Sequence, residues 1–338
     1  MHILTTLPRG GLAGVEITLV APYPRQLYSG MVPGFVAGHY TLDDCVIPLE
    51  PVLRKSGIRW LRHSAVAIDA DARNITLEDG SVHGFDWLSV NTGPVQNRDQ
   101  IEQAMPGARK YGLFVRPIES FGTLWPQVVE LAQSRALRLA VLGGGAAGIE
   151  LAMAIRKRLP NTSITLLTGG TKMAANYPPA DRQQVTRALK RRNITVLVDR
   201  AVGITATEVM LASGARLACD VPLIVTGAQA PAWLESSGLA LDASGFIAAD
   251  AFQRSTSHPH VFAAGDVSSR VALAKNLAAV VTGAPLTQHQ PPKNTLNLLS
   301  CGDQRAIASW GSFAAEGRWV WWLKDWIDRG FIKRYRKD

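Results

Sequence analysis

The chain has 338 residues, of which 47% are hydrophobic, and it carries a formal net charge of +9. This composition excludes a disordered or fibrous protein, and the length predicts two domains of roughly 100–200 residues each. The positive charge favours anionic partners such as nucleotides or acidic membrane surfaces, without choosing between them.

The cysteines and histidines suggest neither a disulfide nor a metal site. Cys45, Cys219 and Cys301 form no CxxC pair and no zinc spacing, which predicts a reducing compartment. His258-Pro259-His260 fits a turn, so we expect no bound metal. The start shows no signal-peptide pattern, and no apolar run approaches the ~20 residues that a membrane-spanning helix needs. We therefore expect a cytoplasmic protein, either soluble or peripheral on the inner membrane face.

The sequence contains an internal repeat, in which the same order of predicted strands and turns occurs twice. Residues 58–93 and 194–227 each reach Ala-Val-x-Ile, continue into a short strand and a glycine turn, and end in an apolar strand followed by Thr-Gly. The turn glycine lies 13 positions before the closing glycine in both copies, from 80 to 93 and from 214 to 227. A matching strand precedes each copy, at 16–20 and 163–167. The sequence therefore predicts two copies of one α/β unit.

The second copy opens with an apolar strand at 137–142, the loop Gly143-x-Gly145-x-x-Gly148 and a helix at 149–158. In this context the glycines let a pyrophosphate approach the helix N-terminus, which predicts a dinucleotide site. A tight turn without a ligand is the plainer alternative. Matching the two copies places the corresponding strand and loop of the first copy before residue 1, so we expect that the first copy lacks them.

The choice between NADH and NADPH stays open. An acidic residue that binds the ribose hydroxyl is expected ~20 residues after the glycine loop. This chain has Thr168-Gly169-Gly170-Thr171-Lys172 there instead. Lys172 fits either a contact to a 2′-phosphate or, more commonly, a solvated lysine in a loop.

Several motifs resemble the pyridine nucleotide-disulfide oxidoreductase superfamily. They are Thr92-Gly93-Pro94, Thr226-Gly227-Ala228 and Val261-Phe262-Ala263-Ala264-Gly265-Asp266. The stretch from Tyr28 to Gly34 and the tail from Cys301 to Tyr335 resemble its type II NADH dehydrogenase-like branch, in particular the flavoprotein fused to selenide, water dikinase in some bacteria. The resemblance spans nearly the whole chain. It implies an α/β fold of two Rossmann-like FAD/NAD(P)-binding domains with a C-terminal cap.

On this basis we expect a discontinuous FAD domain at residues 1–105 and 245–285, an NAD(P) domain at 106–244 and a cap at 286–338. The implied activity passes a hydride from NAD(P)H to FAD and on to a small-molecule acceptor, with a quinone as one candidate. We expect no nucleic-acid partner, and we leave a homodimer open.

The resemblance also implies which residues form the site. The cofactor-binding candidates are Gly143, Gly145, Gly148, Thr92, Gly93, Thr226, Gly227, Gly265 and Asp266. In the family the aspartate of the Gly-Asp motif binds the flavin ribityl chain, while capping of the next helix is the alternative for Asp266. Glu150 matches a glutamate that lies near the isoalloxazine in type II NADH dehydrogenases, so it is the catalytic candidate. Its alternative role is to stabilise the helix dipole.

The chain departs from the family pattern in the flavin site. The first departure is the strand and glycine loop missing from the first copy. The second is the short stretch between Asp266 and Leu277, where the family has a longer one. Either this chain leaves out segments of a longer protein, or it is a variant that holds FAD weakly or not at all. A flavin-free nucleotide-binding or regulatory module is therefore the alternative function. Sulfide:quinone oxidoreductases and disulfide reductases need paired redox-active cysteines, and the sequence shows no such pair.

The tail has an amphipathic pattern. Apolar residues recur at i, i+3, i+4, i+7 and i+8, which places them on one helical face. They are Trp319, Trp322, Leu323, Trp326 and Ile327. Residues 317–338 also hold seven Lys or Arg and three Asp, a net charge of +4. This combination fits an interfacial helix on anionic lipid, while packing on the protein's own core or on a dimer partner is the alternative.

Overall fold

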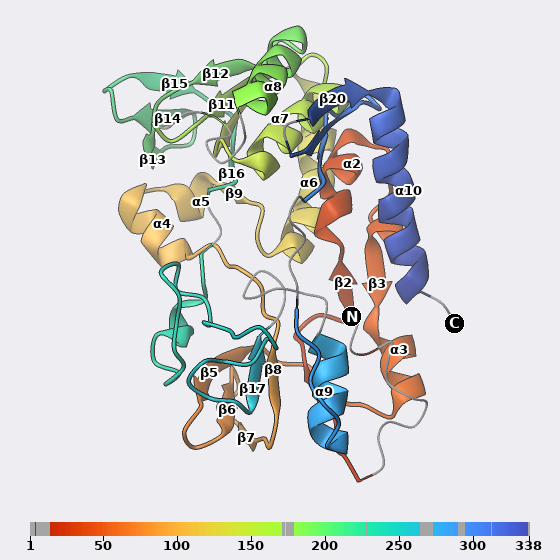
Figure 1. The fold of residues 1–338 in the computed structure, drawn as a ribbon. Coiled ribbons are helices and arrows are strands. Elements are labelled where there is room, and N and C mark those ends of the chain that lie inside the picture. The colour runs from red at the N-terminus through yellow and green to blue at the C-terminus, as the bar shows by residue number, and fades with distance from the viewer. Residues whose placement is uncertain are drawn as a thin grey trace.

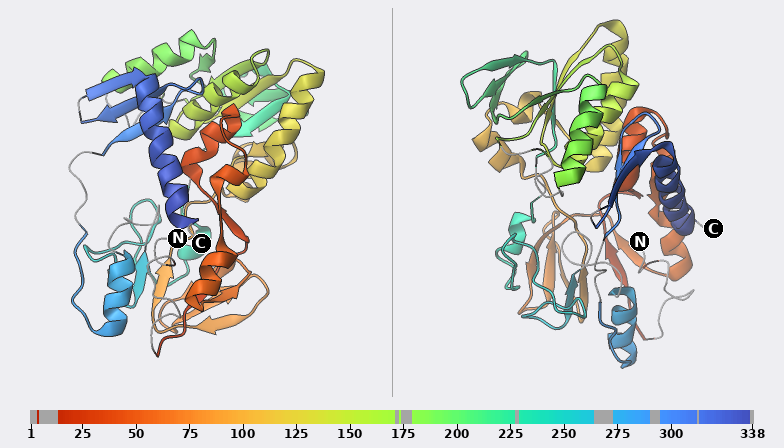
Figure 2. Two further views of the ribbon diagram at one scale, coloured as in Figure 1. Left: turned by 90° about the vertical axis from the view of Figure 1, so that its right-hand side faces the viewer. Right: turned by 45° about the horizontal axis from the view of Figure 1, so that its top comes forward.

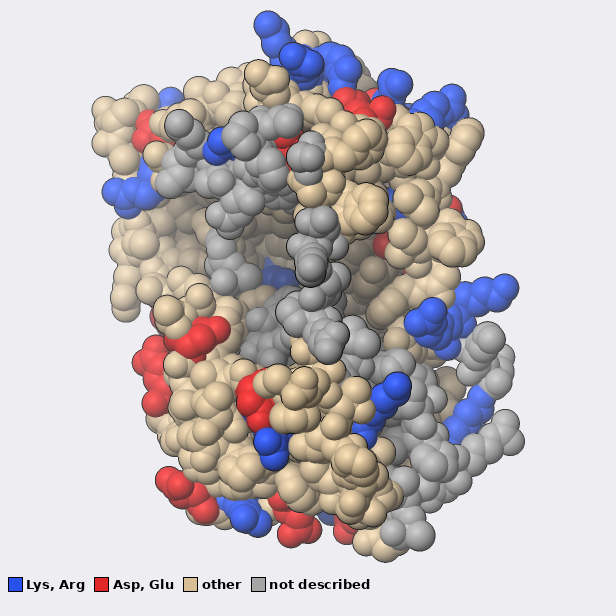
Figure 3. All heavy atoms as spheres, in the orientation of Figure 1, with Lys and Arg blue, Asp and Glu red and all other residues tan. Residues whose placement is uncertain are grey.

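The computed structural model describes Leu4, residues 14–170, Met173, and residues 179–226, 229–263, 273–289, 295–311 and 313–336. Two α/β units lie one above the other in Figure 1, and the C-terminal elements lie along the right-hand side of the upper unit. The face seen in Figure 3 is hollowed between the two units, and Lys and Arg side chains gather along the top of the molecule.

The upper unit contains a five-stranded parallel sheet in the order β12-β11-β10-β16-β9. Its strands are β9 (Leu113–Phe114), β10 (Arg138–Leu142), β11 (Ser163–Leu167), β12 (Thr195–Leu197) and β16 (Val221–Ile224). The helices of this unit are α6 (Ile118–Ser134), α7 (Ala146–Arg158) and α8 (Pro179–Arg191). The four residues 139–142 of β10 are all buried, as expected of a central parallel strand covered on both faces.

The sheet of the lower unit is divided into two parallel pairs. β1 (Thr18–Val20) pairs with β4 (Arg59–Leu61), and β8 (Leu88–Val90) pairs with β17 (Val261–Ala263). By the repeat, β1 and β8 correspond to β11 and β16, which both pair with β10 in the upper unit. Among the described residues, no strand of the lower unit joins the two pairs in the way that β10 does.

A three-stranded antiparallel sheet occurs in each unit. One contains β5 (Ala65–Asp69), β6 (Asn74–Leu77) and β7 (Val82–Gly84), and the other contains β13 (Ala201–Ile204), β14 (Glu208–Leu211) and β15 (Arg216–Ala218). Both sheets shift register at the same place, between residues 65 and 67 and between residues 201 and 203. A bulge at equivalent positions is a specific shared feature, so the structure confirms the internal repeat.

The remaining elements lie outside these sheets or form the C-terminal cap. Those outside the cap are β2 (Arg25–Leu27), η1 (Ser29–Met31), α2 (Val32–Ala37), η2 (Asp43–Cys45), β3 (Val46–Pro48), α3 (Leu49–Ser56), α4 (Arg98–Ala104), α5 (Ala108–Tyr111), η3 (Ala232–Leu234) and α9 (Leu273–Thr282). The cap contains β18 (Asn297–Ser300), β19 (Ala306–Trp310), β20 (Phe313–Gly317) and α10 (Arg318–Tyr335). The views in Figure 2 show α10 alongside α2 and β3.

Helix α7 is the centre of the main hydrophobic core. It starts at Ala146, three residues before the predicted start, because Gly145 already serves as its N-cap. The five residues 151–155 are all buried, so the helix is covered on every side. It contacts β10 and β11 of its own sheet, α8, α2 and strand β18 of the cap. Segments from three distant parts of the sequence therefore share one core.

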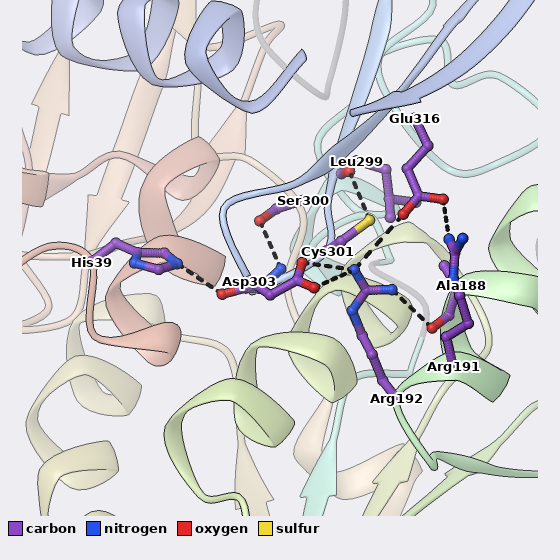
Figure 4. Close-up of polar contacts among 10 residues, drawn as sticks. His39, Ala188, Arg191, Arg192, Leu299, Ser300, Cys301, Asp303 and Glu316 are labelled. Atoms are coloured by element: carbon purple, nitrogen blue, oxygen red, sulfur yellow. Dashed lines mark hydrogen bonds and ion pairs between the residues drawn. The ribbon is translucent and has the colours of Figure 1, made fainter. Parts of the chain in front are cut away.

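The turn between β18 and β19 fastens the cap (Figure 4). On one side His39, which follows α2, donates a hydrogen bond from Nε2 to the Gly302 carbonyl oxygen at 2.7 Å. On the other side the Arg192 guanidinium, which follows α8, contacts the Asp303 carboxylate at 2.6 and 2.8 Å. Arg192 also lies 3.8 Å from the carboxylate of Glu316 on β20. The cap is thus fixed to both the α2 segment and the upper unit.

The core assignment predicts unequal effects of two matched substitutions. Leu166 on β11 is 0% exposed, whereas Leu131 on α6 is 41% exposed. Leu166→Ala should lower the free energy of unfolding by about 2–5 kcal/mol, because it leaves a cavity in a packed core. Leu131→Ala should change it by less than about 0.5 kcal/mol. Denaturant unfolding of both variants measures the difference, and equal effects would contradict this placement of the core.

Candidate functional site

The glycine loop joins β10 to α7, and its three motif glycines have different surroundings. A Cβ added at Gly148 would lie 1.9 Å from the Gly143 carbonyl oxygen, and one added at Gly143 would lie 2.6 Å from the Val225 carbonyl oxygen. These two positions therefore need glycine for close backbone packing. A Cβ at Gly145 would meet no atom within 4 Å. Gly145 thus leaves open space at the N-terminus of α7, where a pyrophosphate would approach.

Two neighbouring strand ends border this loop. Thr168, which follows β11, would lie 2.9 Å from a Cβ at Gly144, and the Thr226 nitrogen, after β16, would lie 3.3 Å from a Cβ at Gly143. The Thr226 hydroxyl is buried and has no hydrogen-bond partner among the described residues. A buried hydroxyl without a partner is unfavourable, so a ligand that bonds to it would be stabilised. The carboxyl edge of this parallel sheet therefore fits a dinucleotide.

Other predicted cofactor residues lie elsewhere. Thr92 and Gly93 follow β8 in the lower unit, where Thr92 is exposed. Gly227, Gly265 and Asp266 lie outside the described residues, as does Lys172. The structure therefore brings together the glycine loop and Thr226, while the predicted flavin contacts of Gly265 and Asp266 stay predictions.

Glu150 points from α7 toward the cap. The backbone nitrogen of Ser300 on β18 donates a hydrogen bond to Glu150 Oε1 at 2.7 Å. The residue keeps part of its surface accessible, yet burial of its carboxyl raises the pKa to about 7. The charge of Lys324 lowers this pKa and that of Asp328 raises it, both less than burial does. The recorded contact to β18 favours a role beyond stabilising the dipole of its own helix.

Two charged residues lie on the buried face of α10, and the charges of both act on the pKa of Glu150. Lys324 Nζ donates hydrogen bonds to the Gly30 carbonyl oxygen at 2.7 Å and to Asp328 Oδ2 at 2.6 Å. The sequence analysis missed both residues, because it considered only the apolar stripe of this helix. Their i, i+4 spacing on the opposite face was the available signal.

Helix α10 packs on the segment that begins at Tyr28. The Tyr28 ring stacks on Phe331 with centroids 4.2 Å apart, and its hydroxyl hydrogen-bonds to Asp328. Further along, the Tyr40 hydroxyl donates to Asp325 Oδ1 at 2.6 Å. The stretch from Tyr28 to Gly34, singled out in the sequence by resemblance, is therefore in contact with the cap.

The three cysteines are buried and unpaired. Burial raises the pKa of Cys45 and Cys301 to about 12 and that of Cys219 to about 11. Thiols with such pKa values are protonated near neutral pH, whereas redox chemistry requires the thiolate. The structure thus agrees with the sequence argument against a reactive cysteine pair.

The apolar stripe of α10 faces outward. Trp319, Trp322 and Trp326 are 53%, 59% and 73% exposed, which contradicts packing of these rings on the protein's own core. Trp310 and Phe313, on the β19–β20 hairpin, are 58% and 59% exposed, and the sequence analysis did not single them out. No described helix combines the length and the apolar character needed to cross a membrane.

Comparison with known proteins identifies the family. Residues 3–281 match the family described as pyridine nucleotide-disulphide oxidoreductase, so the chain belongs to that family. Within it the chain falls in the type II NADH dehydrogenase-like branch, in agreement with its NADH dehydrogenase-like relatives.

Two curated relatives and one solved structure illustrate the match. The demethylphylloquinone reductase NdbB of Synechocystis sp. is 30% identical over 207 residues, which cover 58% of this chain and 50% of that protein. An NADH dehydrogenase-like protein of Mycobacterium tuberculosis is 27% identical over 242 residues, or 68% of this chain and 60% of that protein. The sulfide:quinone oxidoreductase of Aquifex aeolicus superposes with a TM-score of 0.77 at 17% identity, covering 95% of this chain and 85% of that chain.

These comparisons confirm the predicted α/β fold and family. At 17% identity the structural likeness concerns the fold alone. The chain spans 50% to 64% of the length of four curated relatives that it matches.

The glycine loop yields a paired prediction. Gly145→Ala should leave the melting temperature almost unchanged, because the added methyl group enters open space, yet weaken NADH binding about tenfold or more by obstructing the pyrophosphate. Gly148→Ala should lower the melting temperature as well, because its Cβ would collide with the Gly143 carbonyl. Fluorescence titration with NADH and thermal unfolding measure the two effects. Unchanged NADH binding by Gly145→Ala would place the nucleotide elsewhere.

The raised pKa of Glu150 predicts a pH-dependent stability difference. Between its ordinary pKa of 4.5 and about 7, the folded chain holds a proton that the unfolded chain has released. The stability of the wild type relative to Glu150→Gln should therefore fall as pH rises through this window and level off above it. Denaturant unfolding of both proteins across this range measures the difference. A difference that does not vary with pH would contradict the raised pKa.

Proposed function

We propose that this chain is an NAD(P)H dehydrogenase that uses FAD and reduces a small-molecule acceptor of the quinone class. The observation that carries the proposal is the glycine loop at the start of α7, which leaves open space at Gly145 beside the unpartnered Thr226 hydroxyl. This is the geometry of a dinucleotide site in a chain that belongs to a nucleotide-dependent redox family. The narrower resemblance to the flavoprotein fused to selenide, water dikinase stays a prediction.

Each cofactor has its own set of residues in this proposal. Within residues 106–244, NAD(P)H is held by Gly143, Gly145, Gly148 and Thr226-Gly227. Within residues 1–105 and 245–285, FAD is held by Thr92, Gly93, Gly265 and Asp266. When bound, FAD would accept a hydride from the nicotinamide and supply electrons to the acceptor, while the protein provides orientation and electrostatics.

Glu150 supplies the proton chemistry. Because Ser300 donates to Oε1, Oε2 is the oxygen left to carry a proton. A carboxyl with a pKa of about 7 can give or take that proton near neutral pH, which suits a general acid or base.

A quinone fits this arrangement, because its reduction takes up protons as well as electrons. The relative from Synechocystis, at 30% identity, is named for reduction of demethylphylloquinone. We extend that acceptor class to this chain, and we leave the particular quinone and the choice of NADH or NADPH open.

We further propose that the exposed tryptophans of α10 rest on a membrane surface. The described part of the tail, residues 318–336, holds six Lys or Arg and two Asp, a net charge of +4 that suits anionic headgroups. Exposed Trp rings beside basic residues are typical of interfacial helices. Such a contact would bring the protein to the layer in which quinones dissolve. A dimer partner on the same face is the other outcome to test.

Vesicle binding tests this contact. Trp322→Ser together with Trp326→Ser should reduce binding to vesicles that contain anionic phospholipid by about tenfold or more, because two large apolar side chains no longer insert. Trp87→Ser, at a residue 41% exposed in the lower unit, is the matched control and should leave binding unchanged. Co-sedimentation measures the bound fraction. A change in sedimentation velocity without any vesicle binding would favour the dimer.

The flavin-free module remains a second candidate, favoured by the divided sheet of the lower unit, where no described strand joins β1 to β8. The visible absorption spectrum of the purified protein separates the two functions. We expect a flavin spectrum, either as purified or after addition of FAD, that bleaches when NADH or NADPH is added without oxygen. Absence of a bound flavin even after FAD addition would overturn the dehydrogenase and leave the binding module.

A further inference from the structure

Three parallel strands of the upper sheet end beside the proposed nucleotide site. Strands β10, β11 and β12 are neighbours and run in the same direction, so the residues that follow them lie at one edge of the sheet. Open space continues along this edge, because an added Cβ at Gly145, Gly169 or Gly170 would meet no atom within 4 Å. A dinucleotide with its pyrophosphate at the glycine loop would therefore extend its adenosine half over the end of β11 toward β12.

The ends of β11 and β12 are held together by a backbone hydrogen bond. The Gly169 nitrogen donates to the Asp199 carbonyl oxygen at 3.0 Å. Arg200 follows directly, and its backbone nitrogen donates to Asp199 Oδ1 at 2.7 Å. Residues 168–170 and 198–200 together are called the β11–β12 edge. The bond between them places Arg200 next to the end of β11.

The β11–β12 edge holds no carboxylate that is free to bind a ribose. In Rossmann folds an acidic residue near the end of the second strand accepts a hydrogen bond from the ribose 2′-hydroxyl of NADH. Residues 168–170 are Thr-Gly-Gly instead. The carboxylate of Asp199 is engaged within the chain, because Oδ1 accepts from the Arg200 nitrogen and Oδ2 accepts from the Ser213 hydroxyl at 2.5 Å. The group that normally selects NADH is therefore missing from this edge.

The same edge carries a cation without a partner in the described part of the chain. Arg200 is exposed, and its guanidinium forms no ion pair and no hydrogen bond with a described residue. A guanidinium binds a phosphate group through two parallel N–H donors. Val198, two residues earlier, is 67% exposed and offers apolar surface to an adenine ring. The β11–β12 edge thus fits an adenosine that carries a further phosphate.

We propose that Arg200 makes the site selective for NADPH over NADH by pairing with the 2′-phosphate of the adenosine ribose. This inference rests on the proposed function, because it takes the pyrophosphate to lie at the glycine loop. It goes further by naming the nucleotide and the residue that selects it. Lys172, the candidate for this phosphate in the sequence analysis, lies outside the described residues.

Calorimetric titration of the purified full chain with NADP⁺ and NAD⁺ tests the proposal without turnover. The two oxidised nucleotides differ only in the 2′-phosphate. We expect NADP⁺ to bind at least about tenfold more tightly than NAD⁺. Arg200→Gln should weaken NADP⁺ binding by about tenfold or more and leave NAD⁺ binding unchanged, because only NADP⁺ has the group that the guanidinium pairs with. Arg200→Lys keeps the charge but not the paired donors, so it should retain part of the preference.

Arg187→Gln is the matched control, because Arg187 is an exposed arginine on α8 of the same unit. It should leave both affinities unchanged. The proposal is wrong if NAD⁺ binds as tightly as NADP⁺, or if Arg200→Gln weakens both nucleotides equally. A preference for NADP⁺ that survives Arg200→Gln would also overturn it, since another residue would then hold the 2′-phosphate. Lys172→Gln would in that case lose the preference.

The outcomes separate this inference from the proposed function. If NAD⁺ binds and NADP⁺ does not, the inference fails and the dehydrogenase stands. If neither nucleotide binds to the FAD-loaded chain, the nucleotide site fails and the inference falls with it. A chain that shows the Arg200 effect but whose flavin stays oxidised after NADPH is added would keep the inference and contradict the dehydrogenase.

Discussion

The structure depends on the close approach of α7 to the loop that precedes it. Gly148 has no side chain, so the first turn of α7 packs directly on the Gly143 carbonyl. That contact fixes where the helix starts and leaves the open space at Gly145. The rest of α7 is buried, with the parallel sheet on one side and α2 and the cap on others. One helix thus positions both the glycine loop and the glutamate that faces the cap.

The cap completes the surroundings of that glutamate. Its strand β18 supplies the Ser300 amide, and its helix α10 carries one cation and one carboxylate whose charges act on the pKa of that glutamate. The buried face of α10 is held by the stack of Phe331 on Tyr28 and by the hydrogen bond from Lys324 to Gly30. The tryptophans on the opposite face are therefore exposed. The environment of Glu150 and the proposed membrane contact are therefore consequences of one docking geometry.

Much of this could be predicted from the sequence, since the informative signals were local or repeated. The glycine loop, the repeated strands at 74–77 and 208–211 and the family all agree with the structure and comparisons. The sequence analysis made no prediction where contacts join distant segments. The hydrogen bond from Ser300 to Glu150 spans 150 positions and that from Lys324 to Gly30 spans 294, and no local pattern encodes either. Likewise, periodicity identified the tryptophan stripe but could not say whether it faced inward or outward.

The central claim is that hydride leaves a nicotinamide nucleotide bound at the glycine loop. Anaerobic stopped-flow reduction of the FAD-loaded protein, comparing NADH or NADPH with the same nucleotide deuterated at the transferred C4 position, tests it most directly. We predict that flavin absorbance bleaches and does so more slowly with the deuterated nucleotide, and that Gly145→Ala requires a higher nucleotide concentration for the same rate. A flavin that stays oxidised with NADH and with NADPH would contradict the account.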